Sequence, residues 1–188
     1  MITVISGTNN KGSNTKIFAR HYAELLHQRT DQEVKFLALE DMPSDWFHNT
    51  MYAAASQAPS LTAVQDEYIL PAANFVIFSP EYNGGFAGSL KLFIDACSIR
   101  EYAKNFKDKR VALLGVSSGR AGNLRGMEQL TGIFNYLGTH VMPNRLPISQ
   151  IDNLLNEDKT EITDAETLKV MAKHADEYLI FIRDRVTA

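Results

Sequence analysis

The chain has 188 residues, 45% of them hydrophobic and 22% charged, a balance that excludes a disordered chain and suits one domain. The formal net charge of −3 provides no basic field for a nucleic-acid backbone, so we expect no nucleic-acid partner. Because no apolar run approaches the roughly eighteen residues of a membrane-spanning helix, we expect no membrane partner.

The chain begins with MITVISG, which has no charged n-region and no small-residue cleavage site, so we expect no signal peptide. The single cysteine, Cys97, cannot form an internal disulfide, and this fits a reducing compartment. We therefore expect a cytoplasmic protein. We interpret Cys97 as a small core residue rather than a nucleophile, because it falls within an apolar helical segment.

Short apolar runs rich in β-branched residues alternate with helical patterns along the chain. The expected strands are Ile2–Ser6, Val34–Leu39, Phe75–Ser79, Arg110–Ser117 and His140–Met142. The expected helices are one of about fifteen residues from Asn14, Leu61–Leu70, Gly88–Lys104, one ending near Leu137 with Gly138 as C-cap, and a last helix opened by a Thr163–Glu166 capping box. Residues 40–60 form an irregular excursion.

This alternation predicts a doubly wound α/β fold with a parallel sheet. The first, third and fourth strands are nearly continuous apolar runs, as expected when helices cover both faces of a sheet. Five strands favour the flavodoxin-like order 2-1-3-4-5. No linker or repeat divides the sequence, so we predict a single domain over residues 1–188.

Three loops rich in Gly, Ser and Asn follow the first, third and fourth strands. They are GTNNKGSNT (7–15), SPEYNGGFAG (79–88) and GVSSGRAGN (115–123). In an open α/β sheet, ligands bind outside the carboxyl ends of the strands near the point where the strand order reverses. The loops therefore predict a binding site at this edge.

The first loop precedes a helix N-terminus, where unpaired N–H groups and the helix dipole attract an anion. Gly7 and Gly12 have the spacing of a P-loop, but Ser13 and Asn14 replace its Lys-Ser/Thr pair. The Gly-x-Gly-x-x-Gly fingerprint of dinucleotide sites is also absent. A monophosphate held by neutral donors fits the loop, and a tight turn with Ser and Asn caps is the alternative. Glycines and Tyr82 of the later loops suit a flat heterocycle.

Segments GTNNKGSNT, PEYNGGFAGSLKLFID and GVSSGRAGNLRGMEQLTGIFNYLGTHVMP resemble the signature regions of the NADPH-dependent FMN reductase family, the flavodoxin-like quinone, azo-dye and chromate reductases. The resemblance covers most of residues 1–143. It implies FMN as cofactor, with NADPH or NADH as co-substrate. The family commonly has an arginine where this chain has Asn10, and Lys11 and Lys16 are neighbouring cations that could compensate.

The resemblance also implies the site residues. The FMN phosphate would lie against Thr8, Asn10, Ser13, Asn14 and Thr15, the isoalloxazine ring against Pro80, Glu81, Tyr82 and Asn83, and the other side of the ring against Ser117 and Gly119. No metal site and no catalytic side chain are expected, because the flavin carries the chemistry. Two roles stay open for Arg120: it contacts the phosphates of NADPH, or it is a solvent-exposed loop residue.

The expected function is hydride transfer from NAD(P)H through FMN to a small-molecule electron acceptor such as a quinone, azo or nitro compound. The resemblance implies a homodimer or a tetramer. The apolar content of Phe86, Leu90, Leu92, Phe93 and Ile94 adds to this, because one helix face can hardly bury them all. Two alternatives stay open, a flavodoxin-like electron carrier without its own turnover and a non-flavin scaffold of the same fold.

Overall fold

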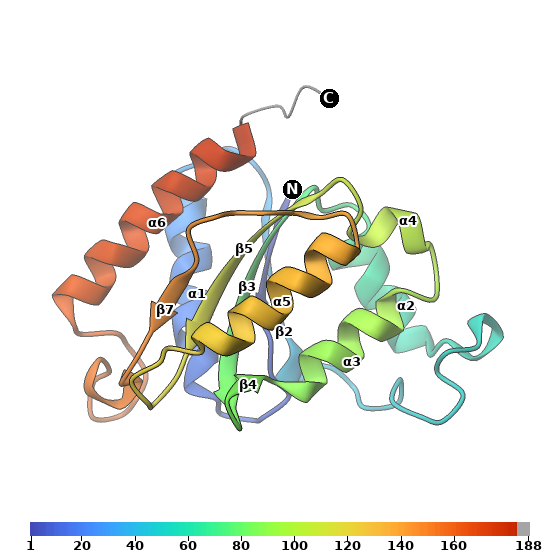
Figure 1. The fold of residues 1–188 in the computed structure, drawn as a ribbon, viewed down its shortest axis with the longest axis horizontal. Helices are drawn as coiled ribbons and strands as arrows, with labels where there is room; N and C mark the ends of the chain where they lie inside the picture. Colours follow the sequence, from blue (N-terminus) through green and yellow to red (C-terminus); the bar gives the residue numbers. More distant parts are fainter. Residues whose placement is uncertain (184–188) are drawn as a thin grey trace.

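The sheet of the protein is built from parallel strands in the predicted order (Figure 1). The computed structural model describes residues 1–183. The central strands are β1 (Ile2–Ser6), β2 (Val34–Ala38), β3 (Asn74–Tyr82), β5 (Arg110–Val116) and β6 (His140–Val141). They lie in the order β2-β1-β3-β5-β6. Because β4 is a short hairpin strand outside this series, the order is the flavodoxin-like 2-1-3-4-5 expected from the sequence, and the fold prediction is confirmed.

The fifth position of the sheet is shared by two short strands. β6 pairs with the start of β5, and β7 (Leu146–Ile148) pairs with its last three residues. Between them the chain leaves the sheet at Pro143, which has no N–H group to donate to a neighbouring strand. The remaining strand, β4 (Gly85–Phe86), pairs antiparallel with the end of β3. The sequence predicted β6 but missed β4 and β7.

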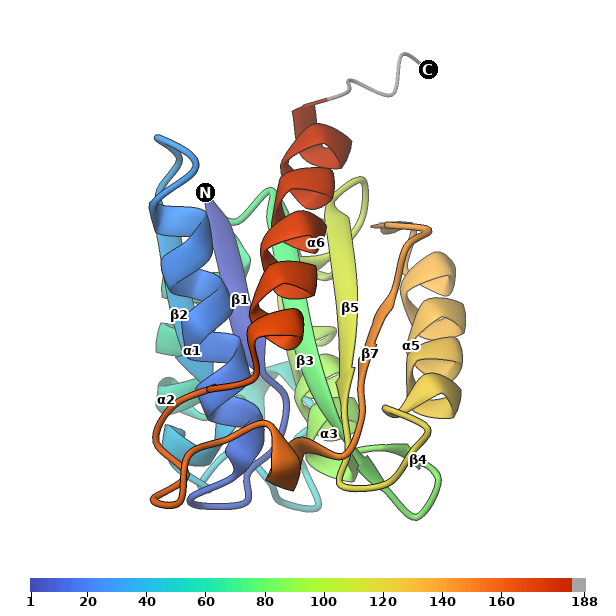
Figure 2. The ribbon, with the colours of Figure 1, turned by 90° about the vertical axis from the view of Figure 1, so that its left-hand side faces the viewer.

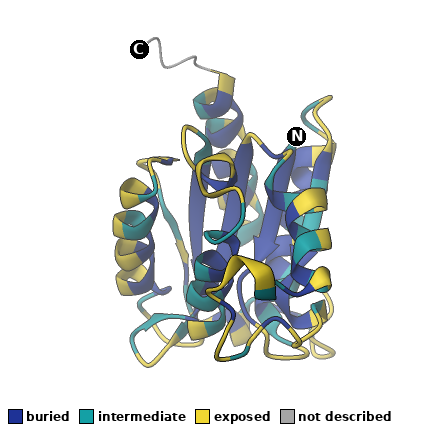
Figure 3. Ribbon diagram, turned by 90° about the vertical axis from the view of Figure 1, so that its right-hand side faces the viewer, coloured by how far each residue is buried: buried dark blue, intermediate teal, exposed yellow. Residues whose placement is uncertain are grey.

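Helices cover both faces of the sheet (Figure 2). One face carries α1 (Asn14–His27) and α6 (Ala165–Arg183), and the other carries α2 (Pro59–Val64), α3 (Gly88–Cys97) and α5 (Leu124–Tyr136). The protein therefore has two hydrophobic cores, one on each side of the sheet. Figure 3 shows buried strands between helices whose outer faces are exposed.

The strands supply side chains to both cores. In β1, Ile2 and Val4 belong to the core under α1 and α6, whereas Ile5 belongs to the core on the opposite face. All three are buried. This is why β1 reads as a continuous apolar run rather than an alternating one.

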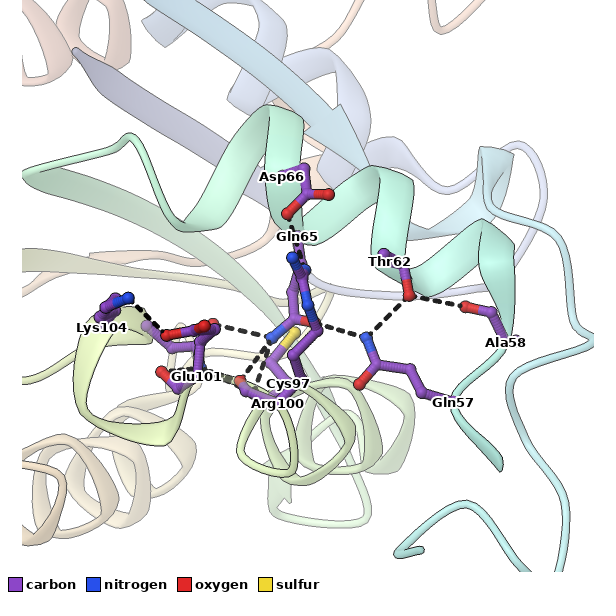
Figure 4. Close-up of polar contacts among 10 residues, drawn as sticks. Gln57, Ala58, Thr62, Gln65, Asp66, Cys97, Arg100, Glu101 and Lys104 are labelled. Atoms are coloured by element: carbon purple, nitrogen blue, oxygen red, sulfur yellow. Dashed lines mark hydrogen bonds and ion pairs between the residues drawn. The ribbon is translucent and has the colours of Figure 1, made fainter. Parts of the chain in front are cut away.

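The helix predicted over Gly88–Lys104 is broken. α3 ends at Cys97, and a short helix, α4 (Tyr102–Asn105), follows a turn in which Glu101 has φ +53°. The buried amide of Gln65 donates to the carbonyl oxygens of Cys97 (2.8 Å) and Arg100 (3.1 Å), two of the residues labelled in Figure 4. Asn105 Nδ2 donates to the same two carbonyls. These bonds satisfy the Cys97 carbonyl at the end of α3 and the Arg100 carbonyl in the turn that follows.

Gln65 also marks a change in the preceding helix. The predicted segment Leu61–Leu70 forms α2 and then a π-helical turn, η3 (Gln65–Ile69).

The excursion contains two 3₁₀ turns, η1 (Leu39–Asp41) at its start and η2 (Ala54–Ser56). Trp46 is buried in the core on the α3 side, so part of the excursion is a packed element.

Two predicted caps can be compared with the structure. Gly138 follows α5 with φ +74°, and the bonds from its N–H to Asn135 and from Thr139 N–H to Phe134 form a Schellman motif, as predicted. At α6 the capping side chain is that of Asp164, not Thr163, because the Asp164 carboxylate accepts the Thr167 N–H at 2.8 Å.

Across residues 1–183, no helix is both long and apolar enough to cross a bilayer.

A buried histidine joins α6 to α1. His174 Nε2 lies 3.1 Å from the Asn144 carbonyl oxygen, and its Nδ1 lies 2.8 Å from the Tyr22 hydroxyl. The carbonyl can only accept, so Nε2 carries the proton and Nδ1 accepts from Tyr22. Burial lowers the pKa of His174, although the Asn144 carbonyl and Glu177 oppose this. The native state therefore holds the imidazole neutral.

This arrangement makes the stability of the fold depend on pH. Above the unfolded-state pKa of about 6.5, His174 is neutral in both the folded and the unfolded state. Below that pKa the unfolded chain binds the proton more readily than the folded protein does. The free energy of unfolding therefore decreases as the pH is lowered. Urea denaturation at about pH 7.5 and about pH 5 should show a smaller fall for His174→Gln than for the unmodified protein, by about 1.4 kcal/mol per unit of pKa lowering. Equal falls in both proteins would contradict this assignment.

Candidate functional site

Three loops meet at the lower edge of the sheet in Figure 1, where β1, β3 and β5 end. α1 follows β1 on one face of the sheet, and α3 follows β3 on the other. The strand order thus reverses between β1 and β3, which is the position where ligands bind in open α/β sheets.

A cavity of about 410 Å³ lies between these loops. Its lining includes eight of the residues expected from the sequence, namely Asn10, Ser13, Asn14, Thr15, Pro80, Glu81, Tyr82 and Ser117. Gly12, Val116, Ser118, Ile151, Asp152 and Lys159 also line it. Three expected residues, Thr8, Asn83 and Gly119, lie in the same loops outside the lining. The volume falls within the range of about 300–1,000 Å³ typical of ligand pockets.

The N-terminus of α1 opens onto this cavity. Ser13 is the N-cap, and its hydroxyl accepts the Thr15 N–H at 3.3 Å. Gly12 adopts φ +72°, a left-handed conformation that suits glycine. The first turn of α1 contains no acidic residue. The helix end is therefore suited to an anion through its N–H groups and its dipole.

The first and second loops are tied together. The Thr8 hydroxyl lies 3.1 Å from the Tyr82 hydroxyl and also accepts the Asn10 N–H at 3.2 Å. The Asn9 N–H donates to Ser89 Oγ at 3.3 Å. Thr8 thus lies outside the cavity lining but holds Tyr82, which lines it.

The second loop is a tight β-hairpin. β3 extends to Tyr82, beyond the strand predicted from the sequence, and Tyr82 pairs with Gly85 in β4. The two residues between them, Asn83 and Gly84, have φ +52° and +75°. Positive φ at both central residues indicates a type I′ turn, for which Asn-Gly is a favoured sequence. Asn83 is therefore at the exposed hairpin tip, and Glu81 and Tyr82 face the cavity.

The third loop is fastened to β3 by Asn123, a residue that the sequence analysis did not single out. Asn123 is buried with φ +60°, and its Nδ2 donates to the Ser79 carbonyl (2.9 Å), Ser79 Oγ (3.1 Å) and the Pro80 carbonyl (3.0 Å). Its own N–H donates to Glu81 Oε2 at 3.1 Å. One side chain thus fixes the spacing between the second and third loops.

Close backbone packing supports the same loop. A Cβ atom on Gly115 would lie 2.0 Å from the Gly122 carbonyl oxygen, so only glycine fits there. The Ser117 hydroxyl donates to the Gly119 carbonyl and accepts the Gly122 N–H, each at 3.0 Å. Ser117 therefore lines the cavity while its hydroxyl holds the loop, and the Gly119 carbonyl also accepts the Gln150 N–H.

Neither Lys11 nor Lys16, the two cations expected near the phosphate, lines the cavity. Lys16 Nζ binds Glu40 (2.9 Å) and Asp41 (2.7 Å), the Asp41 bond being the main cause of its raised pKa. Lys16 lines a neighbouring groove rather than the cavity. Among the described residues, Lys159 is the one cation that lines the cavity, and its segment carries no sequence motif that indicates a site.

The protein is thus a doubly wound α/β protein in which the N-terminus of α1, suited to an anion, meets a cavity at the carboxyl edge of the sheet. The model of the NADPH-dependent FMN reductase family matches residues 1–153, and the chain belongs to that family. FMN is accordingly its cofactor and NAD(P)H its co-substrate.

Solved structures show the same fold. The chain is similar to FerB, a flavoenzyme NAD(P)H:(acceptor) oxidoreductase from Paracoccus denitrificans, with 24% identity over 97% of this chain and 96% of that one and a TM-score of 0.74. It is similar to the NADH:FMN oxidoreductase EMOB, with 18% identity, coverage of 93% and 87%, and a TM-score of 0.69. A flavodoxin from the domain Archaea has 13% identity, coverage of 98% and 100%, and a TM-score of 0.63.

The role of Asn123 leads to a stability prediction. Asn123→Ala should lower the free energy of unfolding by about 3 kcal/mol, because it removes buried hydrogen bonds of about 1 kcal/mol each and places alanine at positive φ. Asn123→Gly should cost about 1 kcal/mol less, because glycine accepts that φ without strain. Urea denaturation measures both. Equal stability of the alanine variant and the unmodified protein would show that Asn123 does not fasten the loop.

Proposed function

We propose that the protein is an FMN-dependent NAD(P)H oxidoreductase that transfers hydride from NAD(P)H to a quinone, azo, nitro or similar small acceptor. The observation that carries the proposal is the cavity shared by the α1 N-terminus, the β3–β4 hairpin and the loop after β5. Bound FMN supplies the redox chemistry, accepting hydride and passing electrons on. We also propose that residues 1–188 act as one domain in the cytoplasm.

In this proposal the first loop holds the phosphate. Ser13, Asn14 and Thr15 at the α1 N-terminus line the cavity, and their side chains and the Asn14 N–H would donate to its oxygens. Asn10 lines the same cavity and would add an amide donor. Thr8 would act through Tyr82, since its hydroxyl lies against that of Tyr82.

The hairpin and the third loop would enclose the ring. Pro80, Glu81 and Tyr82 line one part of the cavity, with Asn83 at the tip of the hairpin, and Ser117 lines another part, with Gly119 beside it. The Glu81 carboxylate accepts the Asn123 N–H, which fits a supporting role better than proton transfer. Arg120 is exposed next to Gly119, where it would meet the phosphates of NADPH.

The experiment is NAD(P)H oxidation with a quinone acceptor while FMN is titrated into flavin-free protein. Ser13→Asp should raise the FMN concentration for half-maximal rate at least about tenfold, because it sets a carboxylate against the phosphate. Aspartate caps a helix as well as serine, so the fold is preserved. Riboflavin, which lacks the phosphate, should show no change.

A matched control is Ser44→Asp, which adds the same charge at an exposed residue of the excursion. An FMN requirement that is the same in Ser13→Asp and the unmodified protein would contradict the phosphate assignment. Flavin binding without NAD(P)H oxidation would favour the electron-carrier alternative. The net charge of −3 argues against that alternative, because it is too small to guide docking to a large redox partner. A protein that binds no flavin would favour the scaffold alternative.

We further propose a homodimer on a surface that shares α3 with the one expected and extends to α5. Leu90, Phe93 and Ile94 of α3 are buried in the protein's own core, so they do not form a surplus of exposed apolar surface. A groove of about 770 Å³ lies between α3 and α5, and its lining includes Phe86 together with the exposed rings of Tyr102 and Tyr136. Exposed tyrosines beside an apolar groove suit a second copy of the chain.

Tyr136→Glu tests this surface. If α5 forms the dimer, the charge should convert the dimer to a monomer, as measured by light scattering at micromolar concentration, because a buried glutamate without a partner is strongly unfavourable. Tyr52→Glu, which changes an exposed tyrosine of the excursion, should stay dimeric. A monomeric unmodified protein would rule out the dimer.

A further inference from the structure

The FMN phosphate carries about two negative charges at neutral pH, and the first-loop side chains that line the cavity are all neutral. The resemblance to the family implies an arginine at position 10, but this chain has Asn10 there. Lys16 does not replace it, because its ammonium is held by Glu40 and Asp41 and lines the neighbouring groove. Lys11 does not line the cavity either, so the cation that lines it comes from elsewhere in the fold.

A segment far along the sequence reaches this position. After β7 the chain forms a 3₁₀ turn, η4 (Ile151–Asn153), and then a loop that passes beside the start of α1 before α6 begins (Figure 2). Gly12 and Ser13 of the first loop line both the cavity and the neighbouring groove together with Lys159. Lys159 thus lies across from the N-terminus of α1.

The turn that carries Lys159 is well ordered by hydrogen bonds. Asn156 Oδ1 accepts the N–H groups of Thr160 (2.8 Å) and Glu161 (3.1 Å), and its Nδ2 donates to Thr160 Oγ1 (2.9 Å). Leu155 and Ile162 pair across its base. The backbone position of Lys159 is therefore fixed before any ligand binds.

Lys159 has φ +51°, a left-handed conformation that is unfavourable for a lysine. Asn or Gly would occupy this position at lower cost. The strained conformation places the lysine at the cavity, and strain of this kind is found at functional sites.

The ammonium of Lys159 has only a weak partner. Its Nζ lies 3.0 Å from Asp152 Oδ1, and both side chains are 52% exposed. Exposed ion pairs contribute little and exchange readily. Asp152 also lines the cavity, so its carboxylate keeps the ammonium at the rim without holding it firmly.

We propose that Lys159 is the cation that binds the FMN phosphate, in the role that the family gives to an arginine of the first loop. The inference rests on the proposed function, because it takes the α1 N-terminus as the phosphate site. On FMN binding the ammonium turns from Asp152 to the phosphate oxygens. The phosphate is then held between the α1 N-terminus on one side and Lys159 on the other.

The test is titration of flavin-free protein with FMN and with riboflavin, followed by flavin fluorescence. Lys159→Met should weaken FMN binding about tenfold at low salt, because a charge-assisted hydrogen bond is lost. The loss should shrink as salt rises, since the pair is partly exposed. Riboflavin binding should be unchanged. Lys104→Met is the matched control, because Lys104 is also an exposed lysine paired with a carboxylate, Glu101, away from the cavity.

Two further variants sharpen the test. Asp152→Asn frees the ammonium and should tighten FMN binding severalfold. Asn10→Arg should restore FMN affinity in the Lys159→Met protein, because it returns a cation to the same cavity. Neither variant should change riboflavin binding.

The outcomes separate the inference from the proposed function. If Ser13→Asp weakens FMN binding and Lys159→Met does not, the inference is overturned and the phosphate site stands. If neither weakens it, the phosphate assignment fails as well. If Lys159→Met weakens riboflavin and FMN equally, the lysine acts on the loop rather than on the phosphate, and the inference is again overturned.

Discussion

The parallel register of the sheet is the constraint on which the candidate site depends. Ser6 pairs with Phe78, and Phe78 pairs with Leu114, so the ends of β1, β3 and β5 are brought to one edge. Because α1 and α3 pack on opposite faces, the loops that lead to them diverge there and leave a cavity between them. Apolar contacts on two faces of a sheet therefore create a polar site at its edge.

The loops around the cavity are joined to one another before any ligand binds. Thr8 contacts Tyr82 across the first two loops, and Asn123 joins the third loop to Ser79 and Pro80 of β3. Ordering these segments is thus part of folding rather than of binding. A preformed site loses less entropy when its ligand arrives, so more of the contact energy appears as affinity.

Much of this architecture could be predicted from local sequence patterns. Apolar runs and helical periodicity identified the five central strands, their order and the edge where the loops gather. The Asn83-Gly84 pair also indicates a tight hairpin turn, although we predicted this segment only as a loop rich in glycine.

Other features depend on contacts between distant parts of the chain. Gln65 and Asn105 bind the carbonyl oxygen of Cys97, the last residue of α3, and nothing between residues 88 and 104 indicates this. Asn123 looks like an ordinary loop residue until its φ and partners are known. Lys159 lies in the acidic stretch NEDKTE, where only the three-dimensional path of the chain brings it to α1.

The division of the fifth strand position between β6 and β7 has a consequence for how the protein behaves at high concentration. A long, flat edge strand exposes a row of backbone groups to which another chain can add a strand. Here that edge is made of two short strands separated by Pro143, and β7 itself contains the exposed Pro147. Proline cannot donate to an added strand, and such interruptions discourage edge-to-edge aggregation. The division of this strand thus discourages neighbouring molecules from extending the sheet at the β6–β7 edge.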